Sequence, residues 1–203
     1  MRLSAAVLAV AALAAAGLAP SALARGSFRD AAAGFEVDYP DTWKQGQVPN
    51  PNIKLRLYAE ALPHMRCNVS VHDDPTTAAA SQAQLDAQLT PATAEQFVRD
   101  GLPTGARVKS LKARVVTVSG GKAIDAETVF AAGGGETRGR ELDVFRPGRF
   151  YRLICGGPSA DYPKVAADVD RIVKGFRLAV GAGVAAAPKP AVKAAPAPTG
   201  KKG

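Results

Sequence analysis

The sequence is poor in the side chains that enzymes use for acid–base and nucleophilic chemistry. Among its 203 residues there are only two histidines, His64 and His72, and no Gly-x-Ser-x-Gly elbow. Nucleophilic catalysis needs a nucleophile, a base and a group that orients the base. Because the sequence offers no such set, we do not expect an enzyme. The glycine run at residues 133–135 lacks the Lys-Ser/Thr that follows a phosphate-binding loop, and we expect no cofactor.

No apolar run is long enough to span a bilayer as a stable helix. The longest, Ala5 to Ala19, has roughly 15 residues, whereas a spanning helix needs ~20. The single charge of Arg2 precedes it, Pro20 follows it, and Ala22 to Ala24 offers small residues for cleavage. We expect residues 1–24 to be a signal peptide of a periplasmic or secreted protein, without a transmembrane anchor after cleavage. A retained N-terminal anchor is the alternative.

Large side chains are almost absent from residues 181–203, which consist mainly of Ala, Pro, Gly and Lys. Repeated proline removes helical hydrogen bonds, and the small side chains cannot repay the entropy of ordering the chain. A disordered Ala/Pro/Lys tail is therefore predicted. Its lysines have no acidic residues among them, so weak contact with an anionic lipid or cell-wall surface is one interpretation, and a solvated linker is the other.

Charge of one sign is not concentrated in the remaining chain. The formal net charge of +8 falls to about +3 when Arg2 and the four lysines of the tail are set apart, because all the acidic residues lie between them. Aromatic residues are not interleaved with basic clusters, so we expect no nucleic-acid partner. Residues 25–180 are numerous enough to form a single domain with a core of its own.

Cysteine occurs only twice, and no Cys-x-x-Cys motif is present. Cys67 and Cys155 each lie in an apolar, strand-like segment. An even number of cysteines in an exported protein favours a disulfide. This bond would close a loop of ~88 residues and stabilise the domain by roughly 4 kcal/mol on the chain-entropy estimate. Two separate buried thiols are the alternative.

The hydrophobic pattern of residues 25–180 is mainly that of β-strands. Phe35, Val37 and Tyr39 alternate with acidic residues, which is the period of a half-buried strand. The same alternation predicts strands at residues 53–58, 67–71, 108–118, 123–130, 137–145 and 150–155. Short turns such as Gly120-Gly121 join consecutive strands, so the pattern predicts an antiparallel meander.

Helical features appear in two places. Residues 78–89 permit a helix, and Thr90-Pro91 supplies an N-cap and first position for a helix that reaches about Asp100. Near the C-terminal end, apolar residues from Tyr162 to Phe176 recur at the spacing of an amphipathic helix. Together with the strands, these helices predict an α+β fold in which an antiparallel sheet is covered by helices, as an α/β/α sandwich.

Two segments resemble those of a known family. The stretch from Gly34 to Trp43, Gly-Phe-Glu-Val-Asp-Tyr-Pro-Asp-Thr-Trp, resembles the start of PsbP/Mog1-like domains. Arg149 to Cys155, the helix after it and Ile172 to Phe176 resemble their last strand, C-terminal helix and closing segment. The resemblance implies an antiparallel sheet between helices. Family members include photosystem accessory subunits, a nuclear transport factor and exported bacterial proteins of unassigned role, which implies binding and assembly.

One short cluster has the chemistry of a metal site. His72 and Asp73, with Asp74 beside them, carry an imidazole and carboxylates that zinc can bind, and His64 could join them across a loop. Adjacent residues on an extended strand point to opposite faces, so convergence would require a turn. A solvated strand end is the alternative interpretation.

Arginines recur in the last strands of the sequence. Arg138 and Arg140 fall on one strand face, and Arg146, Arg149 and Arg152 bracket the Pro147-Gly148 turn. They are candidates for a surface that binds an anionic ligand or a partner, and a sheet face or edge protected by charge is the alternative.

These features together predict an exported, non-catalytic accessory protein of the cell envelope. It would act through protein–protein contacts with an envelope protein or assembly that the sequence does not identify. A small-ligand or metal-binding periplasmic module is the alternative.

Overall fold

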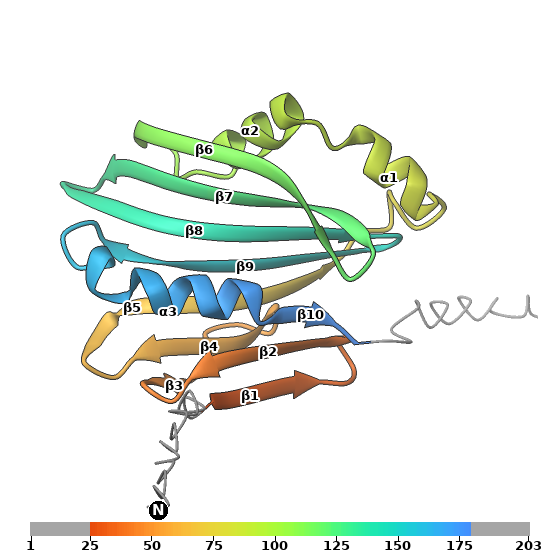
Figure 1. Cartoon of the computed structure of the whole chain (residues 1–203). Coiled ribbons are helices and arrows are strands. Elements are labelled where there is room, and N and C mark those ends of the chain that lie inside the picture. Colours follow the sequence, from red (N-terminus) through yellow and green to blue (C-terminus); the bar gives the residue numbers. More distant parts are fainter. Residues whose placement is uncertain (1–24, 180–203) are drawn as a thin grey trace, which may run out of the picture.

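The computed structural model of the protein describes residues 25–179 (Figure 1). The expected signal peptide at residues 1–24 and the expected tail at residues 181–203 lie outside the described residues. The described chain contains these elements in order: β1 (Arg25–Asp30), β2 (Phe35–Pro40), β3 (Trp43–Gln45), β4 (Ile53–Ala59), β5 (Leu62–Asp73), α1 (Gln82–Gln88), α2 (Pro91–Asp100), β6 (Arg107–Val118), β7 (Gly121–Ala132), β8 (Gly135–Arg146), β9 (Arg149–Pro158), α3 (Tyr162–Lys174) and β10 (Phe176–Leu178).

The strands form two antiparallel sheets. A small sheet has the order β1-β2-β10, and a larger one has the order β3-β4-β5-β9-β8-β7-β6. The small sheet joins the two ends of the described chain, since β10 pairs with β2 from Phe176 opposite Val37 to Leu178 opposite Phe35. The α+β class and the antiparallel pairing are as predicted.

The order of the large sheet departs from a simple meander at β5. Instead of β6, the neighbour of β5 is β9, and Cys67 lies directly opposite Cys155 in that pair. The chain leaves β5 through α1 and α2, enters the far edge of the sheet as β6, and returns strand by strand to β9. Local periodicity predicts each strand but carries no information on which strand lies beside it. The expected meander holds from β3 to β5 and from β6 to β9, but not between these two parts.

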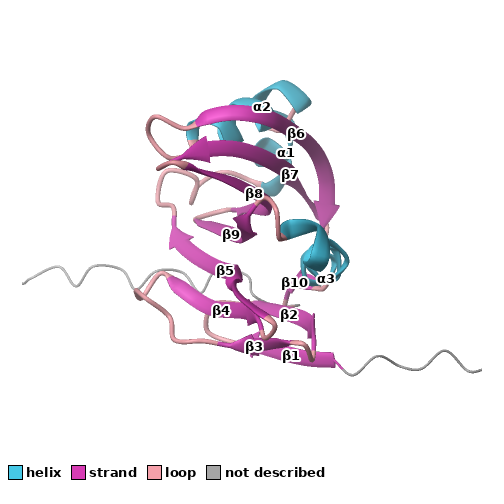
Figure 2. Cartoon of the chain, turned by 90° about the vertical axis from the view of Figure 1, so that its left-hand side faces the viewer, coloured by secondary structure: helices cyan, strands magenta, loops and turns pink. Residues whose placement is uncertain are grey.

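Helices lie on both faces of the large sheet (Figure 2). On one face, α3 buries Val165, Val169 and Ile172 in the main core, which also contains inward residues of β5 and β9 such as Val69 and Leu153. On the opposite face, α2 encloses a second, smaller core. Its fully buried members are Ala94 and Val98 of α2 with Ile124 and Ala126 of β7.

The three helices begin where the local sequence favours it. Ser81 caps α1 and Thr90 caps α2, each in a reciprocal capping box with the residue three positions later. The last helix, α3, begins at Tyr162-Pro163, where the N–H that proline lacks is one that the first turn does not use. At its other end, the C-cap residue Gly175 starts the turn into β10. This turn places α3 directly beside β2.

Candidate binding groove beside helix α3

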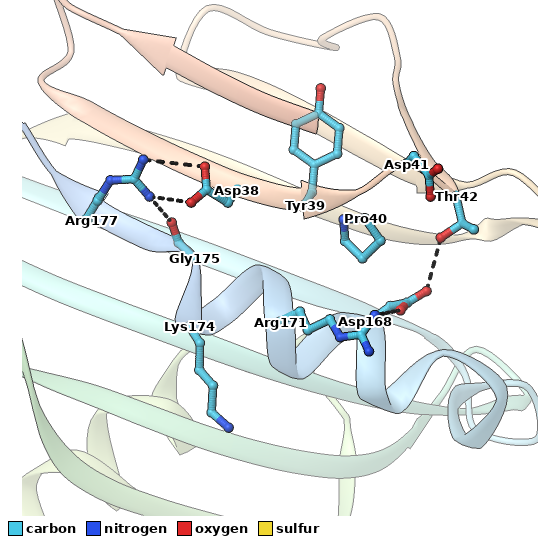
Figure 3. A pocket seen from close by; sticks show the side chains of 10 residues that line it. All are labelled: Asp38, Tyr39, Pro40, Asp41, Thr42, Asp168, Arg171, Lys174, Gly175 and Arg177. Atoms are coloured by element: carbon cyan, nitrogen blue, oxygen red, sulfur yellow. Dashed lines mark hydrogen bonds and ion pairs between the residues drawn. The ribbon is translucent and has the colours of Figure 1, made fainter. Parts of the chain in front are cut away.

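A cavity of about 380 Å³ lies between β2 and α3 (Figure 3). We call it the α3 groove. One wall is formed by the end of β2 and the turn after it, and the other by the second half of α3 and the start of β10. The residues that line it are Asp38, Tyr39, Pro40, Asp41, Thr42, Asp168, Arg171, Lys174, Gly175 and Arg177.

The periodicity of each wall decides which side chains face the groove. In β2, Phe35, Val37 and Tyr39 are buried, which turns Asp38 outward. In α3, the apolar stripe faces the sheet, so Asp168 and Arg171 lie on the flank of the helix that faces the turn after β2. The walls of the groove are therefore the polar sides of two elements whose apolar sides form the core.

The two walls are in backbone contact at Gly175. The Asp38 N–H donates a hydrogen bond to the Gly175 carbonyl at 3.2 Å. A Cβ atom at position 175 would lie 2.5 Å from the Asp38 carbonyl oxygen, closer than side-chain atoms approach a backbone oxygen. Glycine at this position therefore allows the helix and the strand to meet.

Asp168 links the helix to the turn between β2 and β3. Its Oδ2 accepts hydrogen bonds from Thr42 Oγ1 and from Trp43 Nε1, both at 3.2 Å. Trp43 is 1 % exposed, so this indole N–H finds its partner at the edge of the core. The other oxygen of Asp168, Oδ1, lies 3.7 Å from an Arg171 guanidinium nitrogen. The floor of the groove is thus tied to the core by a single carboxylate.

The groove carries charges of both signs. Arg177 donates to Asp38 at 2.7 Å and to Glu36 at 2.9 Å, and its hydrogen bond to Asp38 is the main cause of the raised pKa of Arg177. Lys174 lies 2.7 Å from Asp170, and its side chain points away from the groove in Figure 3. Arg171 is the basic side chain least engaged, and it remains about half exposed.

A second cavity of about 530 Å³ begins on the other side of Thr42 and Asp168, which line both cavities. It is bordered by the apolar side chains of Trp43, Leu62 and Val165, with Lys164 and Glu60 at its rim. The two cavities follow each other along α3; most of the residues that line the first are charged or polar, and the surface of the second is mainly apolar. This arrangement can receive an extended ligand that has both polar and apolar groups.

Comparison with known proteins bears on the fold. No protein-family profile and no curated protein sequence matches the chain. Among solved structures, the solution structure of cyanobacterial PsbP (CyanoP) from Synechocystis matches with a TM-score of 0.54 and 14% identity, over 83% of this chain and 98% of that one. The chain has a PsbP-like fold.

Another match is the crystal structure of LpqN, described as involved in cell envelope biogenesis of Mycobacterium tuberculosis. It has a TM-score of 0.42 and 13% identity, over 71% of this chain and 83% of that one. At these identities the likeness concerns the fold alone.

The α3 groove lies where the two segments that resemble PsbP/Mog1-like domains meet. Gly34 to Trp43 contains β2 and the turn after it, and Ile172 to Phe176 contains the end of α3.

In this PsbP-like fold Cys67 and Cys155 form a disulfide between neighbouring strands β5 and β9. Both residues belong to the main core, with 1 % and 0 % exposure. No free cysteine occurs among residues 25–179.

The structure does not bring the residues of the expected metal site together. His72 stacks on Phe150 at 6.1 Å between ring centroids, and Asp73 faces Arg149 at 3.6 Å. His64 lies at the other end of β5, where its Nε2 is 2.8 Å from Asp161 Oδ2. Within the described part of the chain, no group of three or more His, Cys, Asp or Glu side chains is placed to hold a metal ion.

The structure places four arginines of the expected surface in four separate surroundings. Arg140 is only 7 % exposed and pairs with Asp125 and Asp170, while Arg138 lies over the Tyr162 ring at 4.8 Å. Arg149 faces Asp73, and Arg152 lies on the opposite face of the sheet from Arg140, where it binds Asp143. The sequence pattern did not reveal these carboxylate partners, since each is distant in sequence or on another strand.

Arg140 of β8 and Asp125 of β7 form a buried ion pair within the sheet, and Arg140 also binds Asp170 of α3. The Arg140 guanidinium donates to both Asp125 oxygens at 2.8 Å, and Arg114 donates to Oδ2 of the same carboxylate. Burial alone would raise the pKa of Asp125, but the hydrogen bonds from Arg140 and Arg114 outweigh it and hold the pKa below its usual value.

A second buried charge cluster lies under α2. Asp143 is fully buried and accepts a 2.7 Å hydrogen bond from Arg152, whose guanidinium lies over the rings of Phe97 and Phe150. Burial, together with the nearby charge of Asp143, raises the pKa of Glu141 to about 7. The alternation of Glu141, Asp143 and Phe145 is the sequence signal that could have placed these three on the face covered by α2.

Proposed function

We propose that this protein is an exported, non-catalytic accessory protein of the cell envelope that binds a segment of another protein in the α3 groove. The observation that carries the proposal is the succession of two cavities along α3, which share Thr42 and Asp168 in their lining. A polypeptide segment presents backbone amides, charged side chains and apolar side chains in close succession. A charged cavity followed by an apolar one offers partners to each of these groups.

Two features support the part of the proposal that concerns export. The Cys67–Cys155 disulfide is of the kind that persists in oxidising compartments. Among residues 25–179, none of the helices has both the length and the apolar character needed to cross a membrane. Export itself rests on the predicted signal peptide at residues 1–24, and sequencing the N-terminus of the mature protein tests it.

The charges of the groove suggest how it would hold a partner. Arg171 is about half exposed, and its guanidinium nitrogen lies 3.7 Å from Asp168 Oδ1. A carboxylate of a partner could therefore approach Arg171 more closely than Asp168 does. The neighbouring Lys174 is more exposed, at 72% for its side chain, but its ammonium group is paired with Asp170 and points away from the groove. Bidentate arginine–carboxylate pairs are among the stronger polar contacts in interfaces. We therefore expect an acidic residue of the partner next to an apolar one.

The test is isolation of a partner from the envelope fraction with the mature protein as bait. The double variant Arg171→Glu and Lys174→Glu reverses the charge of the groove wall at exposed positions. The matched control is Arg107→Glu and Lys112→Glu, which changes two exposed cations of β6 by the same amount. We expect a protein that is retained by the wild type and the control and lost from the groove variant. Equal retention by all three proteins would refute the groove as the site.

A second candidate is a module that binds a small ligand, because the volume of about 380 Å³ lies in the range of roughly 300–1,000 Å³ typical of small-molecule sites. Native mass spectrometry of protein purified from its export compartment distinguishes the two. A bound small molecule that is lost in Asp168→Ala, without any retained protein, favours this second function.

A further inference from the structure

Half of one face of the large sheet has no helix over it. On the face opposite α3, α1 and α2 cover β6, β7 and part of β8, as Figure 2 shows. Phe97 of α2 also reaches the first part of β9, where it packs on Phe150 and lies under the Arg152 guanidinium. Over the rest of β9 and over β5 and β4 the described chain places no helix on this side. In an α/β/α sandwich, this is the position at which a further layer would lie.

The register of the strands defines which side chains lie on this uncovered half. Alternation on β4, β5 and β9 turns Leu57, Cys67 and Leu153 into the main core, so their neighbours face the other way. Arg56 is opposite Asn68, which is opposite Ile154, and Tyr58 is opposite Arg66. We call this group the open face; its members are Arg56, Tyr58, Arg66, Asn68 and Ile154.

Ile154 is an apolar side chain without apolar cover. It is 40 % exposed, and within residues 25–179 only it and Val48 are exposed large hydrophobic residues. On the side of Ile154 toward the strand end, Gly156 and Gly139 lie opposite each other, so the sheet has no side chain there. A Cβ atom at Gly156 would lie 2.9 Å from the Arg138 carbonyl oxygen, which accounts for glycine at this position. The sheet beside Ile154 is therefore open to close approach.

The two arginines of the open face have no carboxylate partner among the described residues. Arg56 donates from Nε to the Asn68 side chain at 2.9 Å, and Arg66 donates from Nε to the Pro63 carbonyl at 3.1 Å. In both cases the bond uses one edge of the guanidinium, which leaves further N–H groups available. Arg114, Arg140, Arg152 and Arg177 are by contrast each paired with an aspartate.

We propose that the open face is a second interaction surface, which binds an acidic segment of a partner protein. Aspartate or glutamate side chains of that segment would form bidentate contacts with Arg56 and Arg66, and an apolar side chain would pack on Ile154. A second copy of this chain does not fit, because it would bring the unpaired arginines of two molecules together. The proposal concerns a different face from the α3 groove and stands without it.

The test is a titration of ¹⁵N-labelled mature protein with defined probes, followed by the backbone amide signals. The probes are a 12-residue peptide of alternating glutamate and leucine, the same peptide with lysine for glutamate, and phosphatidylglycerol vesicles. We expect only the acidic peptide to shift amides of residues 56–58, 66–70 and 152–156. We further expect at least tenfold weaker binding by the double variant Arg56→Gln and Arg66→Gln.

Arg107→Gln and Lys112→Gln on β6 serve as the matched control and should bind like the wild type. The proposal is overturned if no probe shifts the open face, if the lysine peptide acts equally, if only the vesicles bind, or if the arginine variant keeps its affinity. The spectrum of the variant shows whether it is folded, and Ile154→Asn supplies a second variant that leaves both arginines in place and should also weaken binding. The groove variant Arg171→Glu and Lys174→Glu should still bind the acidic peptide at the open face. Failure of the open-face proposal can therefore be distinguished from failure of the groove proposal.

Discussion

Loss of the Cys67–Cys155 disulfide should lower the free energy of unfolding by about 4 kcal/mol. The bond joins residues separated by 88 positions. On the chain-entropy estimate, a loop of this size lowers the entropy of the unfolded chain, which at 25 °C corresponds to about 4 kcal/mol of free energy. Both cysteines are buried in the main core. Reduction leaves both sulfur atoms there, so it removes the cross-link with a smaller change in core packing than replacement of the cysteines would cause.

The assay is equilibrium urea unfolding of the mature protein, before and after complete reduction, followed by the fluorescence of Trp43. The control variant Cys67→Ala and Cys155→Ala should unfold identically with and without reductant. It should be at least as unstable as the reduced wild type, because it also lacks two buried sulfur atoms. A loss below about 1 kcal/mol on reduction would show that the cross-link does not stabilise the domain as the loop length implies.

Three further predictions concern single substitutions. Asp125→Asn should cost about 3 kcal/mol in urea unfolding, because it leaves the Arg140 guanidinium buried with a weaker partner. The pKa of Glu141, about 7 in the folded protein against 4.5 ordinarily, means that the folded state keeps a proton that the unfolded chain releases. Stability should thus fall between about pH 5 and pH 8, by at most about 3 kcal/mol, and Glu141→Gln should flatten this profile. Gly175→Ala should lower the thermal midpoint, at a cost of about 1–3 kcal/mol, because its Cβ would meet the Asp38 carbonyl.

The sequence predicted the strands and helices well where the local pattern is strong. The alternation of Phe35, Val37 and Tyr39 and the stripe of α3 both arise from burial on one side of an element, which leaves a regular period in the sequence. The boundaries moved mainly where polar residues continue a strand, as in β5, which runs on to Asp73.

The arrangement of the strands could be predicted only in part. Pairing of β9 with β5 and of β10 with β2 joins residues that are far apart in sequence, and no local period encodes such a pairing. The expected Cys67–Cys155 bond carried the one long-range hint, since it requires β5 and β9 to approach each other. A simple meander of all the strands is not compatible with that approach.

The candidate site was less predictable than the fold. Asp168 belongs to the polar side of α3 and resembles its other acidic residues in the sequence, so nothing marks it as the partner of Thr42 and Trp43. Arg140 was expected on a surface and is buried, because Asp125 and Asp170 compensate its charge from two other elements. The role of a charged side chain depends on partners that only the tertiary structure brings near.

The most direct test of the proposed function is amide hydrogen exchange of the mature protein, alone and bound to the partner that it retains from the envelope fraction. If the partner occupies the α3 groove, slower exchange should appear in residues 38–42 and 164–175, on both walls of the groove. This slower exchange should be absent when the double variant Arg171→Glu and Lys174→Glu replaces the wild type. Protection confined to other elements, or an unchanged pattern in a stable complex, would contradict binding in the groove.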